Sequence, residues 1–233
     1  MLKSVEFNID WYKNFIENTN EKNLLVKKIS DLLEGKPVNS CLEIGLGISP
    51  YFAEGLAKTF NRYLIIEKRK FKGNIPKGVE VINADWGKIG LKESFDVIIA
   101  SHVIYYFEDK KKAIKKMLRS LNKKGRIFFV VNGKSSDYGP LKSAFGEMVG
   151  VKYRFTYDDL IKLLSRRKFR EYTLPSVIKF DSCEKLFETL RLSFDSYPDE
   201  YERMKDMVIK YFKENLRGNK FIIDQKIIEV SLL

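Results

Sequence analysis

The sequence predicts an α/β fold, a doubly wound and mainly parallel seven-stranded sheet with helices on both faces. Between residues 38 and 132, short runs of valine, isoleucine and leucine alternate with segments of helical periodicity. Strands that are apolar throughout are typical of parallel sheets covered on both faces. The chain has 233 residues, of which 44% are hydrophobic, and this is enough for one core of ordinary size.

Residues 1–35 are expected to form an N-terminal segment of two helices. Trp11, Tyr12 and Phe15 recur at helical spacing, and E-N-T-N then breaks the pattern. A second helix with one apolar face follows, and it ends at Gly35, because glycine is favoured just past helix C-termini.

Residues 36–233 are expected to form the main domain, with residues 139–215 as an elaboration added to the sheet. The segment 132–140, N-G-K-S-S-D-Y-G-P, has the composition of a loop. Pro175 is expected to interrupt an extended segment. Strands are predicted over 38–45, 62–68, 78–85, 95–101, 125–132, 169–180 and 221–233, and helices over 50–60, 108–121, 156–165, 182–194 and 199–215.

The composition favours a cytoplasmic protein without a membrane span. No segment reaches the roughly 18 to 20 apolar residues that a span needs, and the first residues lack the layout of a secretory signal. Cys41 and Cys183 are the only cysteines, which fits a reducing compartment. The net charge of +12 fits a polyanionic partner such as nucleic acid. It equally fits an AT-rich genome or adaptation to heat.

A glycine-rich turn ends the first predicted strand. In C-L-E-I-G-L-G-I-S-P, Gly45 and Gly47 allow a sharp bend and a close approach of a ligand to the backbone. Ser49 is expected to cap the next helix and Pro50 to occupy its first turn. A dinucleotide fingerprint would need glycine where Pro50 stands. Glu43 would repel a pyrophosphate but would accept hydrogen bonds from a cationic amino-acid group.

E-I-G-L-G-I-S resembles the first motif, [DE]-x-G-x-G-x-[GS], of the Rossmann-like class I methyltransferases that use S-adenosylmethionine. The resemblance implies that the turn faces the methionine part of this cofactor. It also implies that Glu67, which ends strand two, accepts the ribose hydroxyls, and that Asp85 lies beside the adenine amino group with Trp86 over the ring. Strand four ends in F-D-V-I-I-A-S-H-V-I-Y-Y-F, like the fourth motif of the family, which adds Ser101 to the cofactor site.

One difference from the family motifs restricts the range of expected acceptors. Methyltransferases that act on exocyclic amines of nucleobases usually carry [ND]-P-P-[YF] after strand four, and this chain has S-H-V-I there. That difference disfavours a nucleobase amine as the acceptor. Nucleic acid is therefore a possible partner that the motif does not favour.

The layout of H-V-I-Y-Y-F-E-D, the following helix and the final apolar strand resembles the histamine N-methyltransferase-like family of small-molecule enzymes. This resemblance implies that Glu21 binds a substrate ammonium group, and that His102 and Tyr105 contact the substrate. It implies a polar contact from Asp224, or from Gln225 beside it, on the last strand. Trp11, Tyr12 and Phe15 would then form an aromatic lid.

Each of these residues also has a structural interpretation. An acid such as Glu21 is favoured in the first turn of a helix by the helix dipole, and an aromatic stripe often packs in a core. His102 is the sole histidine and is placed where ligands of open α/β sheets bind, as a base or as an orienting group. The lysines of 110–116 are expected to form a solvated helix face.

Three functions remain open at this level. The first is S-adenosylmethionine-dependent transfer of a methyl group to a small molecule, in particular an amine, with no metal. The second is methylation of RNA or protein, which the charge suggests. The third is a cofactor-binding protein that has lost catalysis, although Glu43, Gly45, Gly47 and Glu67 are all present.

Overall fold

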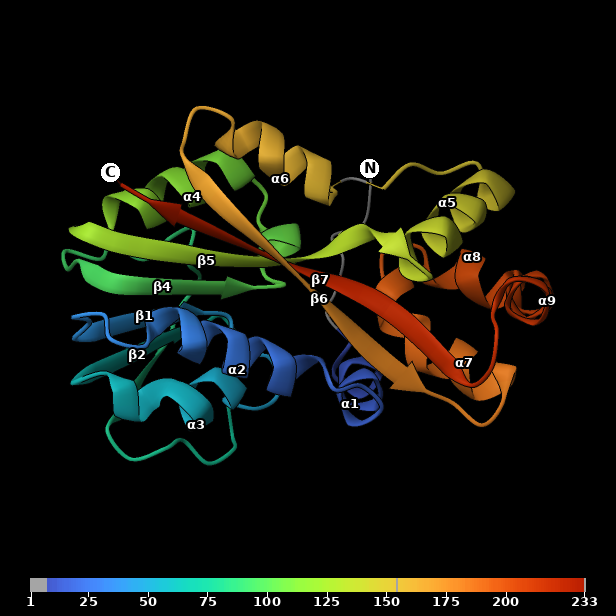
Figure 1. Cartoon of the computed structure of the whole chain (residues 1–233), viewed down its shortest axis with the longest axis horizontal. Coiled ribbons are helices and arrows are strands. Elements are labelled where there is room, and N and C mark those ends of the chain that lie inside the picture. Colours follow the sequence, from blue (N-terminus) through green and yellow to red (C-terminus); the bar gives the residue numbers. More distant parts are fainter. Residues whose placement is uncertain (1–7, 154, 233) are drawn as a thin grey trace. The chain divides into compact units, whose positions relative to one another are not determined.

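The computed structural model describes residues 8–153 and 155–232, which divide into two compact units (Figure 1). The first, called the helical unit here, comprises Met1–Glu21, Gly133–Arg154 and Pro175–Asp224. The second, called the sheet unit, comprises Lys22–Asn132, Phe155–Leu174 and Gln225–Leu233. Each unit is described by itself.

Seven strands form one mixed sheet in the order β3-β2-β1-β4-β5-β7-β6. The register of β1 with β2 and β4, of β2 with β3, and of β4 with β5 is parallel, and Figure 1 shows β7 running opposite to β5. The predicted seven-stranded, mainly parallel sheet is thus confirmed. The strands are β1 Ser40–Ile44, β2 Arg62–Glu67, β3 Val79–Asn83, β4 Phe95–Ser101, β5 Leu121–Ser136, β6 Phe169–Lys179 and β7 Lys220–Ser231.

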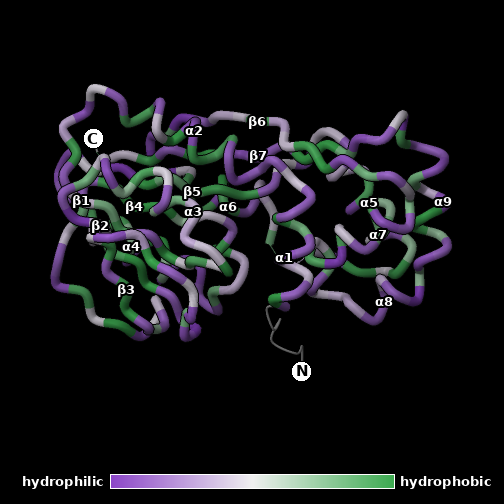
Figure 2. The backbone as a smooth tube through the Cα atoms, turned by 90° about the horizontal axis from the view of Figure 1, so that it is seen from below, coloured by the Kyte–Doolittle hydropathy of each residue, from purple (hydrophilic) through white to green (hydrophobic). Residues whose placement is uncertain are grey.

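Helices cover both faces of the strands in the sheet unit. Side chains of adjacent strand residues point to opposite faces, and residues on both faces are buried by helices. Cys41 of β1 packs with the apolar residues of α2 (Glu21–Leu33) and α3 (Tyr51–Leu56). Leu42, the next residue, packs on the other face with α4 (Lys110–Arg119) and α6 (Tyr157–Leu164). In Figure 2 the chain near β4 and β5 is coloured mostly as hydrophobic, as expected for strands covered on both faces.

The helical unit is built around a cluster of aromatic side chains. The rings of Phe187 and Tyr201 are stacked with centroids 4.2 Å apart, and the Tyr201 hydroxyl donates to the carbonyl of Phe187 over 3.1 Å. Phe194 and Phe145 pack against the same tyrosine. The helices are α1 Ile9–Glu17, α5 Tyr138–Val149, α7 Cys183–Leu190, α8 Pro198–Arg203 and α9 Lys205–Asn215.

The prediction of a loop over 132–140 was wrong. Strand β5 continues to Ser136, and α5 begins at Tyr138. Asp137 accepts a hydrogen bond of 2.8 Å from the backbone N–H of Ile222, which fixes the junction by a contact far away in the sequence. Gly139 is required there, because a Cβ atom would lie 1.8 Å from the carbonyl oxygen of Lys134.

One further expectation differs from the structure. Strand β6 runs through Pro175 without interruption, since β6 is the edge strand and its proline needs no ladder partner on the open side. Helices α1 and α2 belong mainly to different units, and the described residues of 139–215 are divided between the two units. Over the described residues, no helix has the length and apolar content needed to cross a membrane.

Candidate functional site

Most of the residues expected to bind a cofactor lie at one edge of the sheet unit, where β1, β2 and β4 end. Glu43 and Ile44 end β1, Glu67 ends β2, and Ser101 ends β4. Because these strands are parallel, their carboxyl ends meet at the same edge, where open α/β sheets bind ligands. This carboxyl edge is the candidate site.

The glycine turn at this edge adopts a conformation that side chains disfavour. Gly45 has φ +82° and Gly47 has φ +72°. The N–H of Gly45 donates to the carbonyl of Ile66 over 2.9 Å, and a Cβ atom on Gly45 would lie 2.9 Å from Cγ2 of Val103. Two glycines therefore let the backbone bend between β1 and α3, which leaves main-chain atoms at the surface of the site.

Glu67 anchors this turn. Its Oε2 accepts a hydrogen bond of 2.8 Å from the N–H of Leu46, and its Oε1 accepts one of 2.9 Å from the N–H of Arg69. The Arg69 guanidinium also donates to the carbonyl of Gly47 over 3.3 Å. The Glu67 side chain is only 6% exposed. Its Oε1 also accepts from Nε of Arg69 over 3.4 Å, whereas its Oε2 has a second lone pair with which it can accept another donor.

Glu43 is a buried carboxyl group next to the turn. Burial raises its pKa to about 7, although the hydrogen bond of 2.8 Å from the Tyr63 hydroxyl and the positive charge of Lys22 lower it. The neighbouring charge of Glu67 adds to the rise. A cation placed beside Glu43 would favour its ionised form and lower this pKa.

Asp85 lies two residues beyond the end of β3. Its carboxylate accepts a hydrogen bond of 2.8 Å from the N–H of Gly87 and lies 3.2 Å from the ammonium group of Lys68. Burial alone would raise the pKa of Asp85, but these two partners lower it, so the group is ionised near neutral pH. Its side chain is 28% exposed, which leaves it accessible to a ligand.

Two expectations about the cofactor site are not supported. Pro50, and not Ser49, occupies the N-cap position of α3, and no side chain caps that helix. Trp86 is buried in the core beneath α4, where its indole N–H donates to the carbonyl of Ala113 over 3.3 Å and the Lys116 ammonium lies 4.3 Å from its ring centroid. Because its ring is buried there, Trp86 does not present a face to a ligand.

His102 and Tyr105 follow the end of β4. His102 has φ +51°, and its N–H donates to the carbonyl of Val130 in β5 over 3.0 Å. The rings of His102 and Tyr105 are roughly parallel, with centroids 6.3 Å apart, and Phe155 meets Tyr105 edge-on at 6.1 Å. The three rings form an aromatic group at the same carboxyl edge.

Asn132 is a residue of this site that the sequence analysis did not select. Its backbone N–H donates to the Tyr105 hydroxyl over 3.0 Å. Its Oδ1 and the Oγ of Ser101 are buried atoms without a hydrogen-bond partner among the described residues. The available signal was a polar amide directly after the apolar run F-F-V-V. Buried polar atoms of this kind are usually satisfied by a ligand or water.

The remaining candidates belong to the helical unit. Trp11, Tyr12 and Phe15 lie on α1, and Phe15 is buried, in agreement with its interpretation as core packing. Glu21, at the start of α2, is buried, and its backbone N–H donates to Oγ1 of Thr19 over 3.3 Å. Asp224 lies in β7.

Comparison with known proteins finds a similarity that includes this edge. Residues 42–129 match the family model described as a methyltransferase domain, and this range runs from β1 through β4 into β5. No curated protein matches the chain in sequence.

Solved structures share the fold of nearly the whole chain. A protein described as a methyltransferase from an antibiotic biosynthesis pathway of Anabaena variabilis is 17% identical, with a TM-score of 0.63, over 90% of this chain and 97% of that one. One described as a methyltransferase from Bacillus halodurans is 13% identical, with a TM-score of 0.60, over 89% and 98%. The N-methyltransferase NodS of Bradyrhizobium japonicum, in complex with S-adenosyl-L-homocysteine, is 18% identical, with a TM-score of 0.50, over 90% and 85%.

Proposed function

We propose that the protein, whose residues 42–129 match a methyltransferase domain model, transfers a methyl group from S-adenosylmethionine to an amine nitrogen of a small molecule. The observation that carries this proposal is the group of His102, Tyr105 and Asn132 beside the carboxyl edge. Aromatic faces attract cationic amines, and a side-chain oxygen such as Oδ1 of Asn132 accepts hydrogen bonds from an N–H group. The similarity to an N-methyltransferase is in line with this acceptor.

The residues of the edge suit the three parts of the cofactor. Gly45 and Gly47 would admit the methionine part, and Glu43 would accept its ammonium group. Glu67 would accept the ribose hydroxyls, and Asp85 the adenine amino group. Ser49 and Ser101 are candidates for further polar contacts. The proposed fit is chemical, because the Glu67 carboxylate adjoins a turn whose two left-handed glycines carry no side chains.

S-adenosylmethionine supplies a sulfonium-bound methyl group, which an attacking nitrogen takes while the sulfur–carbon bond breaks and sulfur keeps the electron pair. The protein must hold the nitrogen in line with that bond, since alignment and proximity can supply most of the acceleration. His102 would orient the acceptor or take the proton that it loses. The Tyr105 hydroxyl accepts a hydrogen bond from the backbone N–H of Asn132, and the ring held in this way would limit the position of the substrate.

Transfer of a labelled methyl group from S-adenosylmethionine to a panel of primary, secondary and aromatic amines tests the proposal. We expect label in at least one amine and S-adenosylhomocysteine in equal amount. Label confined to hydroxyl or thiol compounds, or to added RNA or protein, would contradict it.

Variants at His102 separate its two roles. His102→Asn suits the positive φ of this position and keeps a hydrogen-bonding group, whereas His102→Gly keeps only the backbone freedom. If His102 takes a proton, both variants should lose about 10²- to 10⁴-fold in turnover. If it only orients the substrate, His102→Asn should retain much more. Cofactor affinity should be unchanged in both, and its collapse would place His102 elsewhere.

A further inference from the structure

The positive charge of the chain is concentrated in one unit. The ranges of the sheet unit contain 28 lysines and arginines against 15 aspartates and glutamates, a net charge of +13. The ranges of the helical unit contain 15 against 16, a net charge of −1. A genome-wide or thermal bias toward lysine would raise the charge of both units. The segregation therefore points to a role of the sheet unit's surface.

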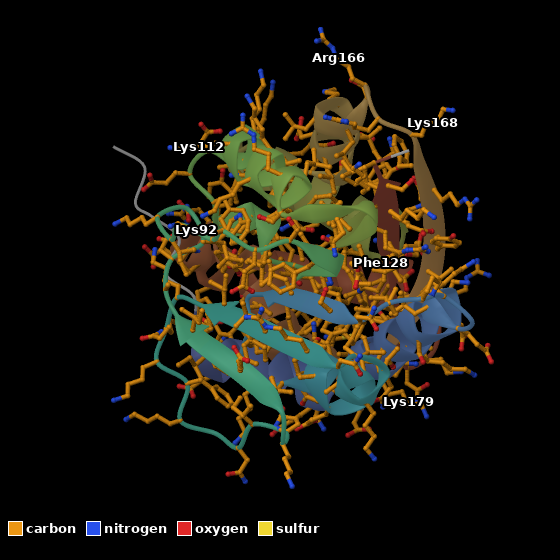
Figure 3. All side chains as sticks on the ribbon, turned by 90° about the vertical axis from the view of Figure 1, so that its left-hand side faces the viewer. Lys92, Lys112, Phe128, Arg166, Lys168 and Lys179 are labelled. Atoms are coloured by element: carbon orange, nitrogen blue, oxygen red, sulfur yellow. The ribbon has the colours of Figure 1, made fainter. Side chains whose placement is uncertain are left out.

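Exposed cations gather at the edge of the sheet unit where the parallel strands begin, opposite the carboxyl edge. Figure 1 shows the start of β5 and the α6–β6 turn at this end, and Figure 3 views it directly, with Arg166 and Lys168 pointing away from the ribbon and Phe128 inside it. The six residues at the ends of these elements are called the amino-edge cluster here: Arg119, Lys123, Lys124, Arg166, Arg167 and Lys168.

All six side chains of the amino-edge cluster are exposed, and none makes an ion pair with the acids that the structure describes. The acids of this edge have other partners. Glu229 accepts hydrogen bonds of 2.9 Å from both Arg126 and Tyr172. Asp96 accepts from the N–H groups of Asn39 and Ser40 and from the Asn122 amide. The positive charges of the cluster are therefore not neutralised by the described acids.

The two halves of the cluster are spaced for a phosphate backbone. Strand β7 lies between β5 and β6 in the sheet, so the starts of β5 and β6 are about two strand spacings, or about 10 Å, apart. The shared contacts of Glu229 to Arg126 of β5 and Tyr172 of β6 hold these strands together at this end. Three of the six cations are arginines, whose planar guanidinium groups bind phosphate through paired hydrogen bonds.

We propose that the amino-edge cluster is a docking surface for the phosphodiester backbone of a nucleic acid. A membrane surface fits less well, because peripheral membrane binding combines cations with buried apolar side chains, and Leu163 is the one large exposed apolar residue of α6 among those described. Strand β4 separates the two edges by seven residues, about 20 Å. The bound nucleic acid is thus a docking partner, and the methyl acceptor remains the small molecule at the other edge.

Salt-dependent binding of the full chain to a single-stranded RNA of about twenty nucleotides, and to DNA of the same sequence, tests the proposal. If the six cations contact phosphates, the logarithm of affinity should fall with the logarithm of salt with a slope of about −4 for a single strand. The variant Arg166→Gln/Arg167→Gln/Lys168→Gln should reduce this slope to about −2, and it should weaken binding at least tenfold at about 50 mM salt. Amine methylation by this variant should be unchanged.

The matched control is Lys27→Gln/Lys70→Gln/Lys72→Gln, which removes the same charge from exposed positions of the same unit outside the cluster. It should bind RNA with nearly the wild-type slope. Equal weakening by both triple variants would show a general charge effect and would overturn the proposal. Binding to vesicles of phosphatidylserine but not to nucleic acid, or no binding to either, would overturn it as well.

Discussion

Glu43 is the residue whose environment has the clearest chemical consequence. Its carboxyl group is buried beside the glycine turn, and its pKa is raised to about 7, chiefly by burial. The folded protein therefore holds a proton on Glu43 at pH values where the unfolded chain has lost it. Between about pH 4.5 and 7, this group makes folding less favourable as the pH rises.

Cofactor binding should depend on pH through the same group. If Glu43 accepts the ammonium group of S-adenosylmethionine, binding favours its carboxylate and releases a proton below about pH 7. The dissociation constant should then fall by up to tenfold per pH unit on approaching pH 7 and level off above it. Calorimetric titration at several pH values measures this, and Glu43→Gln should abolish the dependence. If Glu43→Gln shows the same pH dependence of the dissociation constant as the wild type, Glu43 does not accept the ammonium group.

Glu67→Ala should weaken cofactor binding about 10- to 100-fold, because it removes charge-assisted hydrogen bonds, each worth about 1.5 to 3 kcal/mol. It also releases the N–H of Leu46, so part of the loss reflects a loosened turn. Glu34→Ala, at an exposed position of the same unit, serves as the control. Affinity equal to wild type in both variants, measured by titration calorimetry, would be inconsistent with a ribose contact at Glu67.

Among the elements, the bend between β1 and α3 depends on the absence of a side chain at Gly45. Gly45→Ala would combine a left-handed backbone with a contact of 2.9 Å to Val103, whereas Gly78→Ala, at φ +83°, would meet nothing within 4 Å. The backbone term alone costs about 1 to 2 kcal/mol. We expect Gly45→Ala to lower the free energy of unfolding more than Gly78→Ala and to weaken cofactor binding, which Gly78→Ala should leave unchanged.

The double variant Gly45→Ala/Val103→Ala tests the origin of the extra cost. It removes Cγ2 of Val103 and should relieve the contact, so its cost should be less than the sum of the two single variants. Denaturant unfolding of the four proteins measures these differences. Equal stability of Gly45→Ala and Gly78→Ala would show that Val103 moves aside freely.

The elements that could be predicted from the sequence are those with local signals. The apolar runs of β1, β2 and β4 and the glycines between β1 and α3 carry their information within a few residues. The junction at Asp137 depends on Ile222, 85 residues away, and the position of Trp86 depends on Ala113 and Lys116 of α4. The contribution of Asn132 depends on its contact with Tyr105. Such contacts produce no short-range pattern in the sequence.

At the scale of the whole molecule, the two units differ in composition as well as in structure. The sheet unit contains the residues that match the methyltransferase domain model and has a net charge of +13, whereas the helical unit has a net charge of −1. Within the sheet unit, the parallel strands place the residues proposed to bind the cofactor at one edge and the amino-edge cluster at the other. The direction of the strands thus separates the proposed chemistry from the proposed docking surface.

A structure of the full chain in complex with S-adenosylhomocysteine tests the proposed cofactor site most directly. We expect the amino-acid end of this product at Gly45 and Gly47, with its ammonium group at Glu43, its ribose hydroxyls at Glu67, and its sulfur facing His102. A ligand bound at another edge of the sheet, or a glycine turn that stays closed against a ligand under saturating conditions, would contradict this proposal.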